Sequence, residues 1–164
     1  TMGKIIGGGM PVGAYGGKKE IMEQISPLGG VYQAGTLSGN PVAMAAGLAQ
    51  LRILKAHPEI YEGLAEKGEA LYGGLAKIVE EVGAPCVVNH VGSLGCLFFT
   101  PGPVNHYEDA KASDTDAFAS YFAGMLEQGI YLAPSQFEAM FLSASHTMED
   151  VERTLEAAKN ILSR

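Results

Sequence analysis

The segment that decides the fold is Met2-Gly-Lys-Ile-Ile-Gly-Gly-Gly-Met-Pro-Val-Gly-Ala-Tyr-Gly-Gly17, which surrounds one lysine, Lys4, with glycine and aliphatic residues. An ammonium group is strongly hydrated, so surface lysines usually lie among polar neighbours. Partial loss of that hydration would lower the pKa of Lys4 and make its amine a nucleophile toward carbonyl groups. The alternative is a lysine at the end of a strand, with its ammonium in solvent. The segment alone leaves both interpretations open.

The composition excludes several classes of function. The 164 residues are 47% hydrophobic, enough for one or two folded units, and carry a net charge of -7 with a pI near 5.0. Such acidity argues against a nucleic-acid or anionic-membrane partner. No run is apolar enough to span a bilayer, and no secretory signal is recognisable. Cys86 and Cys96 fit neither a CxxC motif nor a disulfide framework, which favours the cytoplasm.

Two regions are predicted, residues 1–55 and residues 56–164. In the first, short strands are expected over residues 4–10 and 10–15 and a short helix over 18–24. Asn40 followed by Pro41 is typical of a helix start, and this helix should run to about residue 55. Its alanines and Gly47 would allow close packing against a neighbouring segment. Because the first residues already resemble the middle of a motif, we expect a C-terminal piece of a longer protein.

The second region predicts a small α+β unit, in which helices cover one side of an antiparallel sheet. Apolar residues recur at helical spacing from Glu59 to Val82, and Thr147 opens a capping box for the last helix. Gly92 and Ser93 should form the turn of a hairpin. The remaining expected elements are strands 86–90 and 95–100, a loop over 101–112, a helix capped by Ser113 or Asp114, and strands 130–132 and 139–143.

Two further segments are candidates for binding. Tyr32-Gln-Ala-Gly-Thr-Leu-Ser-Gly-Asn-Pro41 places backbone amides and two hydroxyls just before a helix N-terminus, which suits a phosphate group or is simply a capping loop. Glu138 is the only charge in an apolar stretch, so it lies either on an exposed turn or opposite a polar or cationic group of a ligand. The scattered histidines, His57, His90, His106 and His146, do not have metal-site spacing.

Together these segments resemble the class-III aminotransferases, enzymes of fold-type I that depend on pyridoxal 5'-phosphate. The Lys4 and Gly35 segments, Val87-Val-Asn-His-Val91 and Tyr131-Leu-Ala-Pro-Ser135 carry the resemblance, which extends over the whole chain. Gln33-Ala-Gly-Thr36 and Phe137-Glu138 are similar to the glutamate-1-semialdehyde aminomutase branch. The implied fold is the end of the large α/β domain, residues 1–55, followed by the small α+β domain, residues 56–164.

The resemblance implies a role for each candidate residue. Lys4 matches the lysine that binds the cofactor as a Schiff base and moves protons between the cofactor and substrate carbons. Gly35 and Thr36 match the segment that contacts the cofactor phosphate from the neighbouring subunit of a homodimer. Glu138 lies where many family members carry an arginine for a substrate carboxylate, and a glutamate there suits an aldehyde. The implied reaction converts glutamate-1-semialdehyde into 5-aminolevulinate, a tetrapyrrole precursor, with pyridoxal or pyridoxamine 5'-phosphate as cofactor.

The family's other cofactor contacts lie upstream of the lysine and are not in this sequence. We therefore expect these 164 residues to be inactive without the missing N-terminal part. Two alternatives remain at this stage. One is a different class-III aminotransferase that moves an amine between two substrates, and the other is a non-catalytic α+β interaction module.

Overall fold

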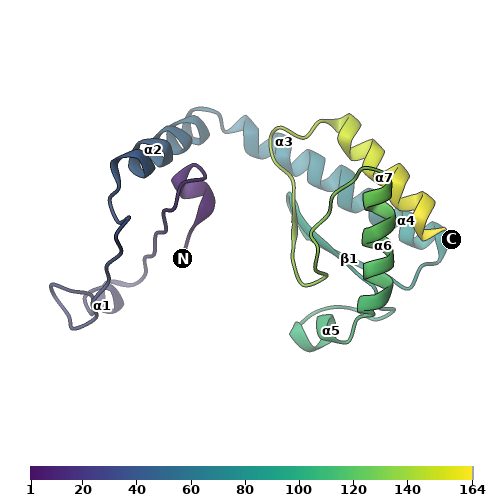
Figure 1. Cartoon of the computed structure of the whole chain (residues 1–164), viewed down its shortest axis with the longest axis horizontal. Coiled ribbons are helices and arrows are strands. Elements are labelled where there is room, and N and C mark those ends of the chain that lie inside the picture. The colour runs from purple at the N-terminus through teal and green to yellow at the C-terminus, as the bar shows by residue number, and fades with distance from the viewer. Residues whose placement is uncertain (164) are drawn as a thin grey trace. The chain divides into compact units, whose positions relative to one another are not determined.

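A computed structural model describes residues 1–163 and divides the chain into two units, Thr1–Pro58 and a second unit that begins at Glu59 (Figure 1). The division falls after Pro58, close to the boundary after residue 55 expected from the sequence. Each unit is described by itself. No helix within residues 1–163 has the length and apolar character needed to cross a membrane.

The first unit begins with a 3-10 turn, η1 (Lys4–Gly7), and not with the predicted strand over residues 4–10. The prediction of extended backbone is wrong here because Lys4 and Gly8 both adopt left-handed backbone conformations, with φ of 53° and 60°, which fold the chain over. Only one isolated bridge replaces the expected strand pair: Met2 and Ala14 exchange backbone hydrogen bonds of 2.7 and 2.9 Å.

Two helices complete this unit, α1 (Lys19–Met22) and α2 (Pro41–Ala56). The predicted start of α2 is confirmed: Asn40 Oδ1 accepts hydrogen bonds of 3.1 Å from the amides of Val42 and Ala43, and Pro41 occupies the first turn. The small residues of α2 pack against η1, as the alanine-rich sequence predicted. Ala43 and Gly47 are both buried at this contact.

The second unit opens with a continuous helical segment made of α3 (Glu59–Gly68), a π-helical turn η2 (Glu69–Gly73) and α4 (Gly74–Val82). The helix predicted over 59–82 is confirmed, but the π turn was not foreseen. Gly83, with φ 67°, ends the segment in the left-handed conformation that glycine adopts most easily. The π turn includes Tyr72, whose side chain is fully buried.

A three-stranded antiparallel sheet follows, in the order β1 (Val87–Val91), β2 (Leu94–Phe98) and β3 (Met140–Phe141). The predicted hairpin is confirmed, because Val91 pairs with Leu94 across Gly92 and Ser93. Residues 130–132 do not form the predicted strand, and β3 spans only two of the residues 139–143. Ile130 and Leu132 instead pack against the core as irregular chain, so burial and not sheet pairing explains their apolar character.

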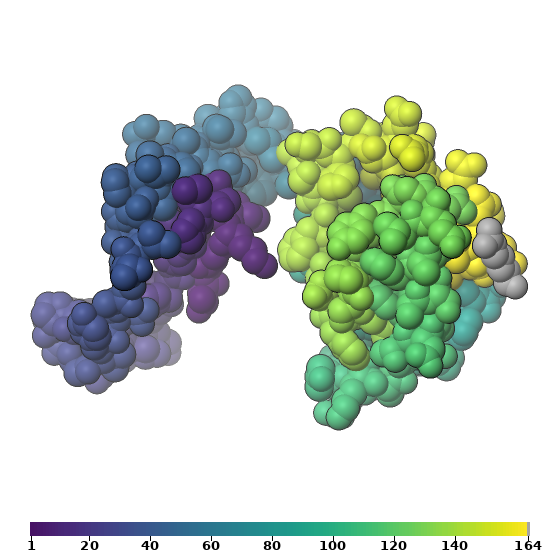
Figure 2. Space-filling view, viewed as in Figure 1, coloured from purple at the N-terminus to yellow at the C-terminus, as the bar shows by residue number. Residues whose placement is uncertain are grey.

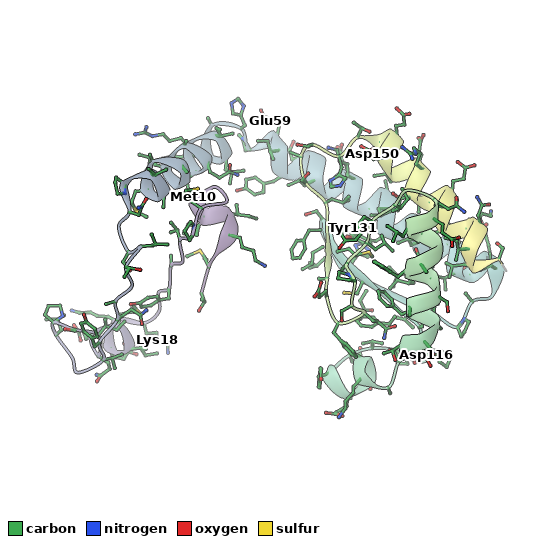
Figure 3. All side chains as sticks on the ribbon, in the orientation of Figure 1. Met10, Lys18, Glu59, Asp116, Tyr131 and Asp150 are labelled. Atoms are coloured by element: carbon green, nitrogen blue, oxygen red, sulfur yellow. The ribbon has the colours of Figure 1, made fainter. Side chains whose placement is uncertain are left out.

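Three more helices complete the second unit: α5 (Tyr107–Lys111), α6 (Thr115–Glu127) and α7 (Met148–Leu162). Asp114 caps α6 and the Thr147 capping box opens α7, both as predicted, whereas α5 lies in a region expected to be loop. Side chains from the helices and the sheet fill the interior (Figure 3). The core residues shared by these elements are Leu71, Tyr72, Leu75, Cys86, Leu97, Phe99, Tyr121, Met125, Val151, Ala157 and Ala158.

Glycines on two helices allow α7 to pack closely in this core. A Cβ added at Gly74 of α4 would lie 2.7 Å from a methyl carbon of Leu155, and one at Gly124 of α6 would lie 3.2 Å from Ile161. Both contacts involve side chains of α7, so α4 and α6 each come near to it. The result is a helical layer against the short sheet, the α+β arrangement expected from the sequence.

Candidate functional site

Lys4 lies on the η1 turn of the first unit with its side chain exposed. Of the two interpretations left open for Lys4, the structure favours an ammonium in solvent, because Lys4 is exposed and its neighbour Ile5 is 64% exposed. The reason is that the aliphatic side chains and the lysine project from a turn, and not from a strand between two neighbours. The Lys4 amine forms none of the ion pairs found within residues 1–163.

Two glycines allow the lysine turn to pack closely against α2, and a third allows it to pack against Val12. A Cβ at Gly47 would lie 2.6 Å from the carbonyl oxygen of Ile6, and one at Gly8 would lie 2.7 Å from the carbonyl oxygen of Ala46. A Cβ at Gly7 would lie 2.9 Å from the Cβ of Val12. These contacts involve backbone or stiff side-chain atoms, so larger residues would push the turn away from the helix. The position of Lys4 therefore depends on close backbone packing.

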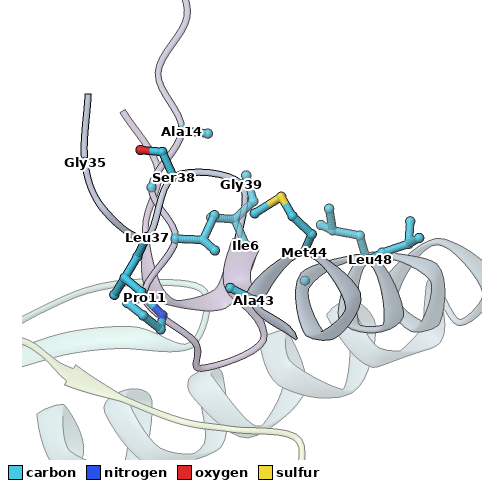
Figure 4. Close-up of a pocket in the computed structure, with 14 residues that line it drawn as sticks. Ile6, Pro11, Ala14, Gly35, Leu37, Ser38, Gly39, Ala43, Met44 and Leu48 are labelled. Carbon is cyan, nitrogen blue, oxygen red and sulfur yellow. The ribbon is translucent and has the colours of Figure 1, made fainter. Parts of the chain in front are cut away.

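A groove of about 690 Å³ lies next to this turn, within the first unit. Its walls come from η1, the segment 11–14, the loop 35–39 and one face of α2 (Figure 4). Most of the lining is apolar, including Ile6, Leu37, Met44 and Leu48. Ser38 adds a hydroxyl to the loop wall.

Gly35 lines the groove, whereas Thr36 is exposed beside it. The loop is a compact turn, with the Ser38 amide donating to the Gly35 carbonyl at 3.0 Å and the Asn40 amide donating to the Leu37 carbonyl at 3.0 Å. The first amides of α2 are not available to a phosphate group, because Asn40 already accepts from them. Within residues 1–163 the amides of Gly35 and Thr36 donate to no backbone carbonyl. These amides, and not the helix start, are the donors that an anion could use.

Glu138 belongs to the second unit and lies on an exposed turn. Its amide donates to the Ser135 carbonyl at 3.0 Å, and its carbonyl accepts a hydrogen bond of 3.9 Å from the Cys96 thiol. Burial raises the pKa of Cys96, so this thiol stays protonated and able to donate. Glu138 is exposed, so its carboxylate is open to a ligand. The turn interpretation of Glu138 is confirmed, and it leaves the ligand interpretation possible.

Gln136, two residues before Glu138, was not selected from the sequence, whereas Phe137 entered only through the family resemblance. Gln136 is 3% exposed and forms a hydrogen bond with the Phe99 amide, and the Phe137 ring lies 6.5 Å from the Tyr107 ring, centroid to centroid. Glutamine is rarely buried, so nothing in the linear pattern distinguishes it from a surface residue. Within residues 1–163 no three metal-ligating side chains come together.

Comparison with known proteins identifies the family. The family model for aminotransferase class-III matches residues 1–162, nearly the whole chain. The chain belongs to the class-III aminotransferase family. All three candidate segments, around Lys4, Gly35 and Glu138, fall within the matched residues.

Among curated class-III relatives, the chain is 64% identical over 162 residues to "Glutamate-1-semialdehyde 2,1-aminomutase" of Ruminiclostridium cellulolyticum. The match covers 99% of this chain and 37% of that protein, so the chain spans a little more than a third of its relative's length.

Two solved class-III structures have the same fold. A β-phenylalanine aminotransferase from Variovorax paradoxus superposes with a TM-score of 0.85 at 35% identity, over 97% of this chain and 36% of that one. A transaminase solved with PLP bound gives a TM-score of 0.79 at 30% identity, over 98% and 37%. The two units described above therefore follow the fold of PLP-dependent transaminases.

Proposed function

We propose that this chain is the C-terminal part of a pyridoxal-phosphate-dependent aminomutase that converts glutamate-1-semialdehyde into 5-aminolevulinate, a tetrapyrrole precursor. The observation that carries the proposal is an exposed lysine amine, Lys4, on a turn fixed to α2 beside a groove lined by Gly35. The 64% identity to an aminomutase supports this reaction over transfer between two substrates. Because the chain spans 37% of that relative, we expect activity to require the rest of the protein.

The donor groups of the first unit fit a phosphorylated aldehyde such as pyridoxal 5'-phosphate. Lys4 offers a primary amine that is open to a carbonyl group. Gly35 and Thr36 offer unpaired amides and a hydroxyl, which suit a phosphate group. The bound cofactor would supply an electron sink for breaking and forming bonds at the substrate's amine-bearing carbons.

Lys4 would hold the cofactor through Nζ and, when released, carry protons on Nζ between the substrate carbons. This task requires the amine to return to the same position after each transfer, since general acid–base catalysis depends on distance first. The packing of η1 on α2 meets this requirement, because the turn cannot move away from Gly47 or Ala46 without losing backbone contacts. The flexible four-carbon side chain of lysine lets Nζ move between the substrate carbons, while the packed turn keeps its backbone in one place.

Glu138 would select the substrate by repulsion. A carboxylate at this position disfavours a substrate whose reacting end carries a carboxylate, and it accepts one whose reacting end is an uncharged aldehyde. The exposed position of Glu138 on its turn leaves the side chain free to take this role. An arginine at the same place would favour ordinary amino acids.

The remaining parts of the proposal concern assembly and location. We propose a homodimer in the cytoplasm, in which Gly35 and Thr36 of one subunit contact the cofactor phosphate of the other. The exposed position of Thr36 at the edge of the groove is compatible with a donor that serves a neighbouring subunit.

Borohydride reduction of the full-length protein with pyridoxal 5'-phosphate, followed by peptide mapping, tests the role of Lys4. A phosphopyridoxyl group on Lys4 is expected. Lys4→Ala should abolish the adduct and lower turnover by about 10²–10⁴-fold, the usual contribution of a proton-transferring group. Lys18→Ala, which removes another exposed lysine of the same unit, should leave both unchanged. Labelling that never reaches Lys4 would contradict the proposal.

Substrate tests separate the aminomutase from other class-III aminotransferases. The full-length enzyme should convert glutamate-1-semialdehyde into 5-aminolevulinate with no added amino donor or acceptor. A strict requirement for a second substrate would show instead an intermolecular aminotransferase.

A further inference from the structure

The turn that carries Glu138 has one buried polar side chain, Gln136. Only 3% of Gln136 is exposed, whereas Phe137 is 50% exposed and Glu138 lies on the surface. Burying an amide side chain is unfavourable unless it forms hydrogen bonds. The Gln136 Nε2 atom has no partner among the described residues, so only half of this amide is satisfied.

The satisfied half of Gln136 binds the end of strand β2. Phe99 lies one residue beyond the last paired position of β2, where Phe98 pairs with Val87, and it is buried. A buried amide needs an acceptor, and Gln136 Oε1 accepts from the Phe99 N–H at 3.5 Å. This bond ties the turn to the end of the sheet.

Hydrogen bonds within the turn then link the backbone on either side of Gln136 to that of Glu138. The Phe137 amide donates to Ser135 Oγ at 3.2 Å, and the Glu138 amide donates to the Ser135 carbonyl at 3.0 Å. With Ser135 and Phe137 fixed on either side of a buried Gln136, the backbone of Glu138 has little freedom. Its carboxylate therefore projects from a defined point.

We propose that Gln136 is the positioning residue for Glu138, acting by anchoring the 135–138 turn to the Phe99 amide. An apolar residue in the same space would avoid an unsatisfied amide and would favour stability. A glutamine at position 136 is therefore explained by its hydrogen bond, which fixes the turn that carries Glu138, and not by its contribution to packing. The inference rests on the substrate role proposed for Glu138.

A double-mutant cycle in the full-length enzyme tests the inference. Gln136→Met keeps the approximate size of the side chain and removes its hydrogen bond. It should lower, about 10-fold, the ratio of kcat/KM for glutamate-1-semialdehyde to kcat/KM for glutamate, which carries an α-carboxylate, since one buried hydrogen bond is lost. In the Glu138→Gln background the same substitution should have almost no further effect, because residues that act as a unit are not additive. Additive effects would overturn the proposal.

Amide hydrogen exchange supplies a readout that does not depend on activity. Gln136→Met should increase exchange of the Phe99 and Glu138 amides, and unchanged exchange would overturn the anchoring role. Ser113→Ala is the matched control, because Ser113 is the other buried polar side chain with an unpartnered atom within residues 1–163. It should alter neither the substrate discrimination nor exchange in the turn. If Glu138→Gln alone leaves the discrimination against glutamate unchanged, the substrate role of Glu138 fails and the inference falls with it, even where exchange shows the anchor.

Discussion

The position of Lys4 depends on two glycines, Gly47 and Gly8, which have no side chain that would mark them as functional. Gly47 lies on α2 and lets the carbonyl of Ile6 come within the space a methyl group would fill. Gly8 does the same for the carbonyl of Ala46. The catalytic role proposed for Lys4 therefore implies a positioning role for Gly47, a helix residue 43 positions away in the sequence.

Gly47→Ala should displace the lysine turn. The new Cβ would lie 2.6 Å from the Ile6 oxygen, so backbone must shift at a cost of about 1–3 kcal/mol, partly offset by the better helix propensity of alanine. In the full-length protein, the midpoint temperature of thermal unfolding and the extent of borohydride labelling at Lys4 should both decrease.

Gly63→Ala is the control for this substitution. Gly63 also lies inside a helix, α3, but nothing is within 4 Å of its missing Cβ. Alanine there should stabilise the protein by up to about 1 kcal/mol and leave labelling intact. Equal effects of the two substitutions would mean that helix propensity alone, and not the contact with η1, determines the outcome.

At the scale of secondary structure, the capping box of α7 links stability to pH. Thr147 Oγ1 accepts from the Asp150 amide at 3.2 Å, while the Thr147 amide and hydroxyl each donate to Asp150 Oδ2 at 2.8 Å. The hydrogen bonds from the Thr147 backbone and then from its hydroxyl lower the pKa of Asp150 below its ordinary value of 3.8. A depressed carboxyl pKa stabilises the folded state above that ordinary value, and the stabilisation is lost as pH falls through the folded pKa.

Asp150→Asn should therefore destabilise the second unit at neutral pH, and the difference from the parent should shrink below pH 3.8. Chemical denaturation at a series of pH values measures this. Glu156→Gln, at another exposed position of α7, should give a stability difference that does not change in this way between neutral and acid pH. A constant difference for Asp150→Asn down to acid pH would show that the carboxylate charge does not matter.

The helix caps were readable from the sequence because they depend on neighbouring residues. Asn40, Asp114 and Thr147 each bond to amides two or three positions away, so the signal lies in one short segment. The lysine turn was misread because its shape depends on packing against α2, more than thirty residues later. Tertiary contact overrides local preference in such cases.

The site was only partly predictable for the same reason. Lys4, Gly35 and Glu138 stand out by residue type or by resemblance, and each lies in an accessible turn or groove lining. Gln136 could not be selected, because its burial against Phe99 joins segments 37 positions apart. The short helix α5 was not predicted, because it lies in a region rich in proline and glycine. Its Tyr107 ring lies near the Phe137 ring, beside Glu138.

At the scale of the whole molecule, the apolar core is unevenly distributed. The core cluster lies entirely in the second unit, between Leu71 and Ala158. On α2 of the first unit, Val42, Leu48 and Ile53 are about half exposed, at 62%, 49% and 52%. Figure 2 shows one face of each unit as a surface. Exposed apolar residues in such number are typical of surfaces that are covered by further protein.

The second unit should therefore fold without the first. A polypeptide of residues 59–164 is expected to unfold cooperatively and remain monomeric, whereas the chain 1–164 should bind an apolar dye and self-associate. Dye fluorescence and analytical ultracentrifugation of both polypeptides measure the difference. Equal dye binding would contradict the expectation. Under the proposed function neither should convert glutamate-1-semialdehyde, because the chain spans only 37% of its relative's length.

The backbone conformation of Lys4 is one that glycine would adopt with less strain, yet the residue there is a lysine. An L-residue at φ 53° costs about 1–2 kcal/mol compared with ordinary helical backbone, and glycine would relieve most of this strain. Three glycines follow within five positions, so the segment uses glycine freely. Under the catalytic role proposed for Lys4, the lysine is kept at a cost in local stability, and Lys4→Gly should give a more stable protein that forms no cofactor adduct.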